Sequence, residues 1–410
     1  MSDVSLIKIS GPDQTGITQA VTAILADYSV NVLDIGQAVI HNNLALGILA
    51  EIPDQADIKS CFNQLKETVE QLGMSIEFDA VSAVDYQHWI GEQGKPRHIL
   101  TLLVRKVSAE HINAVTSLAS QYGLNIDKIT RLSGRVPLDS IEKSQACVEF
   151  SMRGELTDKI KVRRSLLELT NTLDMDIAYQ EDDMFRRNRR LVVFDMDSTL
   201  IEAEVIDELA KAAGVGAAVS MITESAMQGE IDFDESFRRR VALLAGLKDS
   251  ALQQVADGLQ LTEGAETLIS TLKTLGYKTA ILSGGFSYFA NKLRDKLGFD
   301  YVYANQLDIK DGVVTGEVVG DIVNGERKAE LLKDIASREN IALEQVIAVG
   351  DGANDLPMLS VAGLGIAFRA KPIVKASARQ SISTLGLDSI IYLLGISDRE
   401  RIAAKNNKKR

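Results

Sequence analysis

The sequence contains few of the residues on which several common kinds of catalysis depend. Its 410 residues include two cysteines and four histidines, and neither residue type occurs from Leu191 onward. A Ser-His-Asp triad, a cysteine-histidine pair or a histidine-ligated zinc therefore cannot be assembled from that part of the chain alone. If this part is catalytic, its reactive groups must be carboxylates, lysine, hydroxyls, backbone amides and a metal that prefers oxygen ligands.

Disulfides, membrane spans and export signals are not indicated either. Cys61 and Cys147 lie far apart in apolar-patterned segments, so we expect two buried thiols. No uninterrupted apolar run reaches about 18 residues and the first residues show no signal-peptide pattern, so we expect a cytoplasmic protein with no membrane partner. The net charge of -12 and the isoelectric point near 5.0 would repel nucleic acid, and no nucleic-acid partner is expected.

The composition, 45% hydrophobic and 25% charged, is that of a globular protein, and the length predicts two or three domains. The first 180 residues repeat one pattern, β-α-β-β-α-β, and both copies contain Tyr-x-x-Asn before a β-branched residue, starting at Tyr28 and at Tyr122. Such units form ferredoxin-like α+β sandwiches. We therefore predict two domains of this kind, at residues 1–84 and 97–182, joined by a connector. These are named here the first and second repeats.

From Leu191 onward, short apolar runs alternate with helical stretches. Strands are expected at residues 191–197, 278–285, 346–352 and 363–368. Near-continuous apolar runs fit a parallel sheet with helices on both faces, which predicts a Rossmann-like α/β domain at residues 190–400. Between the first two strands, residues 203–263 have a helical pattern and are long enough to form a small helical cap over the strand ends.

The stretch FDMDSTL, residues 194–200, places Asp195 and Asp197 where the first of these strands should finish. Because alternate residues of a strand point to the same face, we expect the two carboxylates to emerge side by side. Two anions so close repel each other unless a cation lies between them or one holds a proton. The pair indicates a metal site, a proton-transfer role, or both.

Two further strands are expected to end in groups of the same kind. Ser283, Gly284 and Gly285 end one strand and Asp351 ends another, while Lys328 lies at the start of a helix. In open α/β sheets, ligands bind at the carboxyl ends of the strands. The Ser283 hydroxyl, the glycine backbone and the Lys328 ammonium could hold phosphate oxygens there, with the glycines allowing close approach.

These parts match the requirements of phosphoryl transfer. Asp195 is the candidate nucleophile, which would form an aspartyl-phosphate. Asp197 could donate a proton to the leaving alkoxide and later accept one from water, as a general acid and base. Asp351 could bind Mg²⁺ together with Asp195, because this ion takes oxygen ligands.

The motifs DMDST, SGG, the isolated Lys328 and GDGANDLPM, in this order, resemble the four motifs of the haloacid-dehalogenase superfamily over about residues 191 to 395. The resemblance implies that fold and a Mg²⁺ cofactor. Superfamily dehalogenases and P-type ion pumps lack the second carboxylate, so Asp197 favours a phosphatase or a phosphomutase. It further implies substrate contact by Asn354, a metal ligand from the backbone carbonyl of Asp197, and another from Asp355 through water.

The segments DSTLIEAE, AMQGEIDF and RRRV resemble the phosphoserine phosphatase family more closely. This resemblance implies that Glu204 meets the substrate ammonium, that Arg240 meets its carboxylate, and that Met227 and Phe233 cover the bound substrate. The chemistry agrees, because an amino acid is recognised by one anion and one bidentate cation. One departure is Glu263, where the family commonly has proline.

Without the resemblance, these recognition residues have ordinary readings. Arg240 follows Arg238 and Arg239 and could be one surface charge among three, and Met227 and Phe233 could be core residues.

The two repeats resemble ACT domains, which are small-ligand sensors often attached to amino-acid enzymes. In the first repeat, GPDQTG (residues 11–16) follows the first strand and opens a helix, so its backbone amides could meet a carboxylate. We expect a regulatory ligand such as L-serine at Gly11, Asp13 and Gly16, although a plain strand-to-helix turn would look the same. The second repeat lacks these glycines and is expected to be structural or dimer-forming. A homodimer through residues 1–180 is expected.

Taken together, the sequence predicts a Mg²⁺-dependent hydrolase that converts O-phospho-L-serine to L-serine and phosphate, the last step of L-serine biosynthesis. A phosphatase or phosphotransferase acting on another small phosphomonoester, such as phosphohomoserine, is the nearest alternative. A different alternative is an amino-acid sensor whose hydrolase half is inert.

Overall fold

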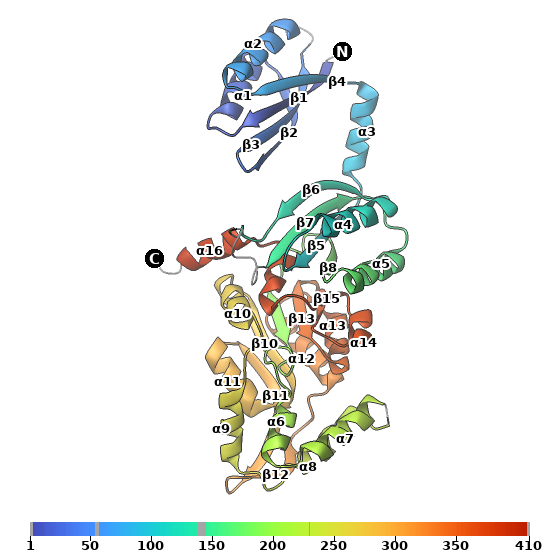
Figure 1. Ribbon diagram of the computed structural model, residues 1–410, viewed down its shortest axis with the longest axis vertical. Coiled ribbons are helices and arrows are strands. Elements are labelled where there is room, and N and C mark those ends of the chain that lie inside the picture. The colour runs from blue at the N-terminus through green and yellow to red at the C-terminus, as the bar shows by residue number, and fades with distance from the viewer. Residues whose placement is uncertain (1–2, 54–56, 136, 138–144, 229, 408–410) are drawn as a thin grey trace. The chain divides into compact units, whose positions relative to one another are not determined.

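The computed structural model describes residues 3–53, 57–135, 137, 145–228 and 230–407. The chain forms two compact units, Met1–Lys95 and Pro96–Arg410, which Figure 1 colours along the chain from blue to red. Within the described residues, no helix combines the length and the apolar character needed to cross a bilayer.

The N-terminal unit has the predicted order of elements. These are β1 (Asp3–Pro12), α1 (Ile17–Asp27), β2 (Asn31–Ile40), β3 (Asn43–Ile52), α2 (Ile58–Gln71) and β4 (Ser75–Val81). The strands form an antiparallel sheet in the order β2-β3-β1-β4. Alternate β3 residues such as Leu44 and Leu46 are buried. They pack with Ile17 and Val21, which lie on one face of α1, and these side chains form a common core.

The stretch after the first repeat is more regular than the sequence suggested. The connector was expected over residues 85–97, between the two repeats, but Ala83–Gln93 form the helix α3. Ser82 begins it, because its hydroxyl accepts a hydrogen bond from the backbone N–H of Asp85 at 3.1 Å. Gly94 ends the helix.

The second repeat belongs to the C-terminal unit. It contains β5 (Arg97–Val104), α4 (Ala109–Gln121), β6 (Asn125–Arg131), β7 (Ala146–Arg153), α5 (Lys159–Thr172) and β8 (Asp176–Glu181), with the sheet order β6-β7-β5-β8. Successive β5 residues enter different cores: Leu102 packs under the helices of the repeat, whereas Leu103 packs with Ile390 and Leu393 from the end of the chain. The second sheet is therefore covered on both faces.

The rest of the C-terminal unit is built on a seven-stranded sheet in the order β12-β11-β10-β9-β13-β14-β15. The expected strands are β9 (Leu191–Phe194), β10 (Lys278–Phe286), β13 (Val346–Gly350) and β14 (Leu364–Phe368), which run parallel. The sequence reading missed β11 (Tyr301–Lys310), β12 (Val313–Val319) and β15 (Gln380–Ile382). β11 and β12 form an antiparallel hairpin on one edge, and their pattern is less apolar than that of the central strands.

Helices cover both faces of this sheet (Figure 1). The side chains of β9 point alternately to the two faces. Val192 and Phe194 pack in the core that includes α10 (Ala265–Thr274) and α11 (Ser287–Leu297). Leu191 and Val193 pack in the core on the other face, which includes α12 (Gly325–Arg338) and α13 (Leu356–Val361). The remaining elements are α14 (Pro372–Ser377), α15 (Ile390–Leu393), α16 (Asp398–Asn407) and the short 3-10 turns at Leu343–Gln345, Ala353–Asp355 and Leu387–Ser389.

The segment predicted as a cap, residues 203–263, contains α6 (Val205–Ala212), α7 (Gly216–Met227), α8 (Phe233–Ala242) and α9 (Asp249–Gly258). The chain enters and leaves it through two neighbouring antiparallel stretches, in which the Glu202 N–H donates to Gln260 at 3.0 Å and the Thr262 N–H donates to Leu200 at 3.0 Å. This pair of crossings defines the two ends of the cap segment. Cys61 and Cys147 are both buried free thiols, as expected.

Candidate active site

The strand order explains why residues distant in sequence meet at one edge of the sheet. β9 lies between β10 and β13, and Phe194 at its end pairs with Ile281 on one side and Val349 on the other. Asp195, Ser283 and Asp351 each follow these paired positions by one or two residues. Parallel strands bring their carboxyl ends to the same edge, so the three polar groups converge there.

Asp195 is held from two sides. Its Oδ1 accepts a hydrogen bond from the backbone N–H of Met196 at 2.7 Å and lies 2.9 Å from Lys328 Nζ. Lys328, which is fully buried, also donates to Asp355 Oδ1 at 2.7 Å. Although burial lowers the pKa of Lys328, the two carboxylates raise it above its ordinary value, so the ammonium stays charged. The lysine provides the cation that two neighbouring carboxylates require.

Asp197 reaches the site by a route that differs from the prediction. The strand ends at Phe194, so residues 195–197 lie in a turn and strand alternation does not place the two carboxylates together. The turn does so instead: Asp197 Oδ1 accepts a hydrogen bond from the Val205 N–H at 3.2 Å, and Ser198 has a positive φ of 53°. Burial and the nearby Glu204 raise the pKa of Asp197 well above its ordinary value, which favours the protonated acid.

Three carboxylates could hold a cation. Asp195, Asp351 and Asp355 each offer an oxygen within 4.8 Å of the others. Asp351 Oδ1 also accepts a hydrogen bond from the Thr199 hydroxyl at 3.0 Å. Burial and the charge of Asp355 raise the pKa of Asp351 to about 7, so the cluster needs compensating positive charge at neutral pH. An all-oxygen ligand set of this kind suits Mg²⁺.

The Ser-Gly-Gly segment lies directly against Asp197. The Ser283 side chain is fully buried, and its hydroxyl oxygen accepts a hydrogen bond from the Gly285 N–H at 2.9 Å. A Cβ on Gly285 would lie 2.3 Å from Asp197 Oδ2, so no larger residue fits this position without displacing the acid. Asn305 supports the Ser-Gly-Gly segment. Its side-chain amide donates to the Gly284 carbonyl at 2.8 Å, and its side-chain oxygen accepts a hydrogen bond from the Val323 N–H at 2.8 Å.

The cap segment brings three of the predicted recognition residues toward this edge. A Cβ on Gly284 would lie 3.1 Å from Cζ of Phe233, which places the ring over the Ser-Gly-Gly segment at the end of β10. Glu204 is exposed and accepts a hydrogen bond from the Ser198 hydroxyl at 2.6 Å. The side chain of Met227 lies outside the described part of the structure, although its backbone ends α7.

Arg240 differs from its two neighbours. It is half-buried, whereas Arg238 and Arg239 are exposed. Its Nε donates to the Ser236 carbonyl at 3.3 Å, and among the described residues it forms no ion pair. Burial lowers the pKa of Arg240, while Asp207, Glu204 and Asp197 oppose that effect. Of the three arginines, Arg240 is thus the one that lies near the acidic residues of the site, and it makes no ion pair with any described residue.

Three supporting residues were missed by sequence reasoning. Thr199 and Asn305 are described above, and Asn324 both caps α12 and donates to the carboxylate of Asp234 in α8 at 3.0 Å. Their partners lie 18 to 152 residues away. The only sequence signal was the position of Thr199 inside DMDST. The predicted substrate residue Asn354 is half-buried, and its carbonyl lies 2.7 Å from where a Cβ on Gly325 would stand.

The site is partly open to solvent, because Asp197 and Asp351 are half-buried and Glu204 is exposed. Asp195 is 6% exposed, and Ser283, Lys328 and Asp355 are fully buried. A cavity of about 450 Å³ in this unit is lined by other residues.

The glycine-framed turn of the first repeat forms at the predicted place. Gly11 lies in β1 with a φ of 155°, and a Cβ there would lie 3.0 Å from the Met74 side chain. Gly16, with a φ of 95°, immediately precedes α1, and the space beside it is open. Asp13 is held by a hydrogen bond from its N–H to the Asn42 carbonyl at 2.8 Å.

Comparison with protein families agrees with this architecture. Residues 189–363 match the haloacid dehalogenase-like hydrolase family, and residues 4–79 and 96–180 each match an ACT domain family. Among curated proteins, the chain is 40% identical to a phosphoserine phosphatase of Streptomyces coelicolor, with 97% of this chain and 94% of the relative covered. It is 38% identical to a phosphoserine phosphatase of Mycobacterium tuberculosis, with 97% of this chain and 95% of the relative covered.

Solved structures give the same result. A hydrolase of the haloacid-dehalogenase family from Salmonella enterica superposes with a TM-score of 0.62 at 32% identity, covering 72% of this chain and 98% of that one. A probable phosphoserine phosphatase from Vibrio cholerae, in an unliganded form, superposes with a TM-score of 0.58 at 33% identity. The match covers 75% of this chain and 88% of that one.

Proposed function

We propose that this chain, which belongs to the phosphoserine phosphatase family, hydrolyses O-phospho-L-serine to L-serine and phosphate, the last step of L-serine biosynthesis. The observation that supports this most directly is the placing of Asp195. Its carboxylate is oriented by Lys328 and the Met196 N–H, and it lies beside a second acid with a raised pKa. A nucleophile and a proton donor in one site are what a stepwise phosphoryl transfer requires.

In the first step, the Asp195 carboxylate attacks phosphorus, so that an O–P bond forms to Asp195 and the bond to the serine oxygen breaks. Asp197 gives its proton to the departing alkoxide, which leaves as the hydroxyl of L-serine. The raised pKa of Asp197 supports this role, because it favours the protonated acid. Burial and Asp355 raise the pKa of Asp195 as well, and Lys328 opposes that effect and favours the carboxylate.

In the second step, water attacks the phosphorus of the aspartyl-phosphate, and the Asp197 carboxylate accepts the proton of that water. Phosphate leaves and the free Asp195 carboxylate is restored. The Ser283 hydroxyl, the backbone of the Ser-Gly-Gly segment, Asn354 and the Lys328 ammonium would hold the phosphate oxygens through both steps.

Mg²⁺ is the cofactor that we propose. Asp195, Asp351 and the backbone carbonyl of Asp197 would hold it, with Asp355 contributing through a water. When bound, the ion would neutralise charge on the phosphate and on the carboxylate cluster. The fit rests on the three clustered carboxylates and on the raised pKa of Asp351, to which burial contributes most and the negative charge of Asp355 next.

Recognition of the amino acid is assigned to the cap segment. Glu204 would bind the ammonium and Arg240 the carboxylate, with Phe233 and Met227 over the substrate. Asp195 is only 6% exposed, so movement of this segment would widen the access of substrate to it. The hydrogen bond between Asn324 and Asp234 is one contact that would break when α8 moves away from α12.

The N-terminal half would regulate the enzyme and join two chains. We propose that L-serine binds at Gly11, Asp13 and Gly16 of the first ACT domain, and that the protein is a cytoplasmic homodimer through residues 1–180. The position of Gly16 immediately before α1 supports this proposal, because backbone N–H groups at the start of a helix can meet a carboxylate.

A phosphate-release assay tests the proposed activity. Purified protein is given O-phospho-L-serine with and without Mg²⁺, and release is expected only with the metal. A panel containing phosphohomoserine and phosphate esters that lack the amine or the carboxylate then separates the alternatives. Loss of either charged group should reduce kcat/KM far more than one added methylene. No release from any ester would instead support the inert sensor.

A further inference from the structure

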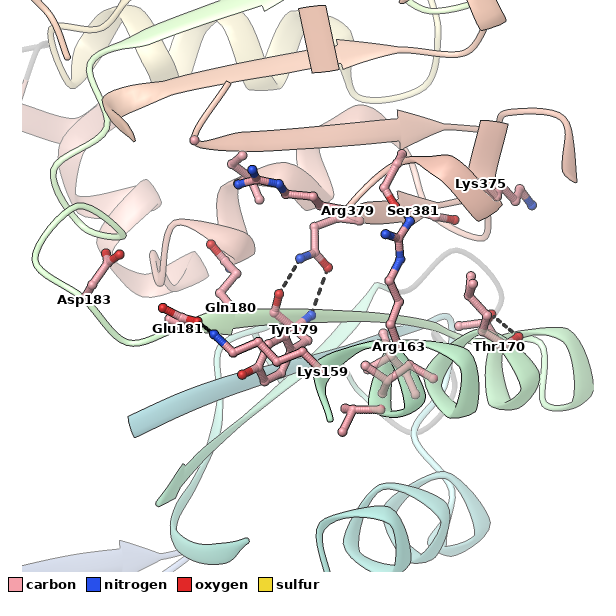
Figure 2. A pocket seen from close by; sticks show the side chains of 18 of the residues that line it. Lys159, Arg163, Thr170, Tyr179, Gln180, Glu181, Asp183, Lys375, Arg379 and Ser381 are labelled. Carbon is pink, nitrogen blue, oxygen red and sulfur yellow. Dashed lines mark hydrogen bonds and ion pairs between the residues drawn. The ribbon is translucent and has the colours of Figure 1, made fainter. Parts of the chain in front are cut away.

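A cavity of about 450 Å³ lies between the second ACT domain and the catalytic domain, away from the proposed active site. Helix α5 and strand β8 form one wall, and α14 and β15 form the other (Figure 2). The walls are joined beside the cavity by Gln380, whose side-chain oxygen accepts a hydrogen bond from the Tyr179 N–H at 2.9 Å. Small-molecule sites typically enclose about 300 to 1,000 Å³, so the space suits an organic ligand.

The cavity is strongly basic although the whole chain has a net charge of -12. Its lining contains five basic residues and two acidic ones. Lys159 is paired with Glu181, which leaves Arg163, Arg189, Lys375 and Arg379 against Asp183 alone. Positive charge gathered in this way attracts anions.

The two most enclosed arginines have no carboxylate partner. Arg189 is 8% exposed; its Nη1 donates to the Glu344 carbonyl, and its Nε has no hydrogen-bond partner within the described structure. Arg163 reaches across from α5 and donates to the carbonyls of Ala376 and Ala378. Across residues 3–407, gaps excepted, neither arginine forms an ion pair. Burying a guanidinium without an anion is costly, so a site of this kind is incomplete without one.

Burial has the expected effect on both groups. It lowers the pKa of Arg189 and of Arg163, and Arg379 lowers the pKa of Arg163 further by repulsion. Arg379 approaches from the opposite wall and is exposed (Figure 2). A bound anion between these groups would relieve the repulsion.

The rest of the lining is mixed, with the polar residues Thr170, Gln180, Gln380 and Ser381 beside a set of apolar side chains. Val162, Leu166 and Ile177 come from the ACT domain and Leu364 from β14. An inorganic ion would leave most of this space unfilled, whereas an apolar body attached to an anionic head would contact both parts of the wall.

We propose that this cavity is a binding site for a small organic anion, with a carboxylate or phosphate head held by Arg163, Arg189 and Arg379 and an apolar body against α5 and β14. The site is distinct from the glycine-framed turn of the first ACT domain and from the phosphatase site, and it does not depend on the proposed activity.

Isothermal titration calorimetry of the full-length protein with phenylacetate and with phenylphosphonate tests the site. Each probe carries one apolar ring, and neither contains a phosphate ester that can be hydrolysed. Saturable binding with one probe per chain is expected. The tighter of the two reports whether the site prefers a carboxylate or a phosphate-like head.

Variants locate the binding. Arg379→Glu should weaken it by about tenfold or more, because an attractive charge becomes repulsive. Leu167→Trp, which fills the cavity, should remove it. Arg164→Glu makes the same charge change at an exposed position of α5 outside the cavity and should leave affinity unchanged, as should Arg240→Ala in the cap segment. Melting curves would verify that each variant is folded.

The proposal is overturned if neither probe binds saturably up to about 10 mM, since that is weaker than the affinity expected of a built site. It is also overturned if Arg379→Glu and Arg164→Glu bind equally well, or if Arg240→Ala loses binding that Arg379→Glu retains. The last result would place the probes in the phosphatase site.

Discussion

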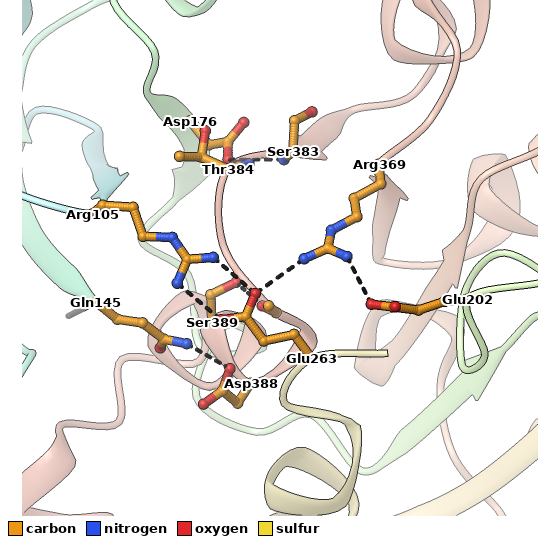
Figure 3. Close-up of polar contacts among 11 residues, drawn as sticks. Arg105, Gln145, Asp176, Glu202, Glu263, Arg369, Ser383, Thr384, Asp388 and Ser389 are labelled. Carbon is orange, nitrogen blue, oxygen red and sulfur yellow. Dashed lines mark hydrogen bonds and ion pairs between the residues drawn. The ribbon is translucent and has the colours of Figure 1, made fainter. Parts of the chain in front are cut away.

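Arg105 and Glu263 form a bidentate ion pair between the second ACT domain and the catalytic domain. Arg105 Nη1 and Nη2 donate to the two carboxylate oxygens of Glu263 at 2.9 and 2.8 Å (Figure 3). Arg369 donates to the same carboxylate at 3.1 Å and to Glu202 at 3.4 Å. Glu202 and Glu263 stand at the two ends of the cap segment, so one chain of ionic contacts links these ends to each other and to the ACT domain.

The pair gives Glu263 a contact that the proline expected from the family resemblance could not make. Proline cannot accept a hydrogen bond through its side chain, whereas Glu263 engages two arginines. Because Arg105 and Glu263 are 38% and 41% exposed in their side chains, solvent screens the pair and its contribution to stability is small.

A double-mutant cycle measures that contribution. Arg105→Ala, Glu263→Ala and the double variant should give a coupling energy of about 0.2 to 1 kcal/mol in urea unfolding, the range of partly exposed ion pairs. Glu266→Ala, at an exposed position of the adjacent helix, serves as the control and should not couple to Arg105. A coupling energy of zero for Arg105 and Glu263 would show that the contact adds nothing to stability.

Replacement of the nucleophile should abolish turnover without unfolding the protein. In Asp195→Asn the amide keeps the shape of the side chain but is a poor nucleophile. In Asp197→Asn, an aryl phosphate with a good leaving group should still phosphorylate Asp195 slowly, whereas breakdown of that intermediate should be blocked for lack of a base. Activity and circular dichroism are measured together, with Asp295→Asn on the exposed side of α11 as control. Normal turnover by Asp195→Asn would refute the mechanism.

Arg240 should affect one class of substrate. Arg240→Ala should raise the KM for phosphoserine and reduce kcat/KM by more than tenfold, because loss of a charged hydrogen-bonded partner costs roughly 2 to 5 kcal/mol. An aryl phosphate, which has no carboxylate, should be much less affected. Arg239→Ala removes a neighbouring exposed arginine and should change neither substrate. Equal losses on both substrates for Arg240→Ala would assign this residue to the fold or to phosphate binding.

Metal affinity should rise with pH. The pKa of Asp351 in the metal-free protein is about 7, above its ordinary value of 3.8. The folded protein therefore holds a proton that the unfolded chain releases near pH 4, and this stabilising difference is lost as pH rises through about 7. Mg²⁺ must displace the same proton, so its stabilising effect should be larger at about pH 8 than at about pH 6. Thermal melts with and without Mg²⁺ measure this, and the opposite order would contradict the assignment of Asp351.

Regulation by L-serine should require the first ACT domain. Coupling between effector and active site is typically about 1 to 3 kcal/mol and is reciprocal for binding. Because serine is also the product, its effect on the full chain is compared with its effect on a shortened chain that begins at Pro96, the boundary between the two compact units. Removing residues up to Arg186 would be unsuitable, since Arg186 is buried in an ion pair with Glu149 of the second ACT domain. Identical responses of both chains, with no serine binding by calorimetry, would exclude this regulatory site.

Much of the fold followed from local patterns in the sequence. The order of strands and helices in both ACT domains and the strands β9, β10, β13 and β14 were predicted within a few residues. Strand alternation and apolar runs are patterns among residues that are close in the sequence, so they can be recognised without the tertiary structure. The meeting of Asp195, Ser283 and Asp351 could also be anticipated, because parallel strands have only one carboxyl edge.

Other features depended on contacts between distant segments. The turn that carries Asp197 is held by the Val205 N–H of α6, Thr199 donates to Asp351, and Asn305 of β11 supports the Ser-Gly-Gly segment. Arg163 and Arg189 look like ordinary charges in the sequence and become a basic cavity only where α5 packs beside α14 and β15. Likewise, Glu263 is a single departure from a family pattern until packing sets it between Arg105 and Arg369. Burial and pairing of charges are properties of the packed chain, because they depend on which side chains exclude water from one another.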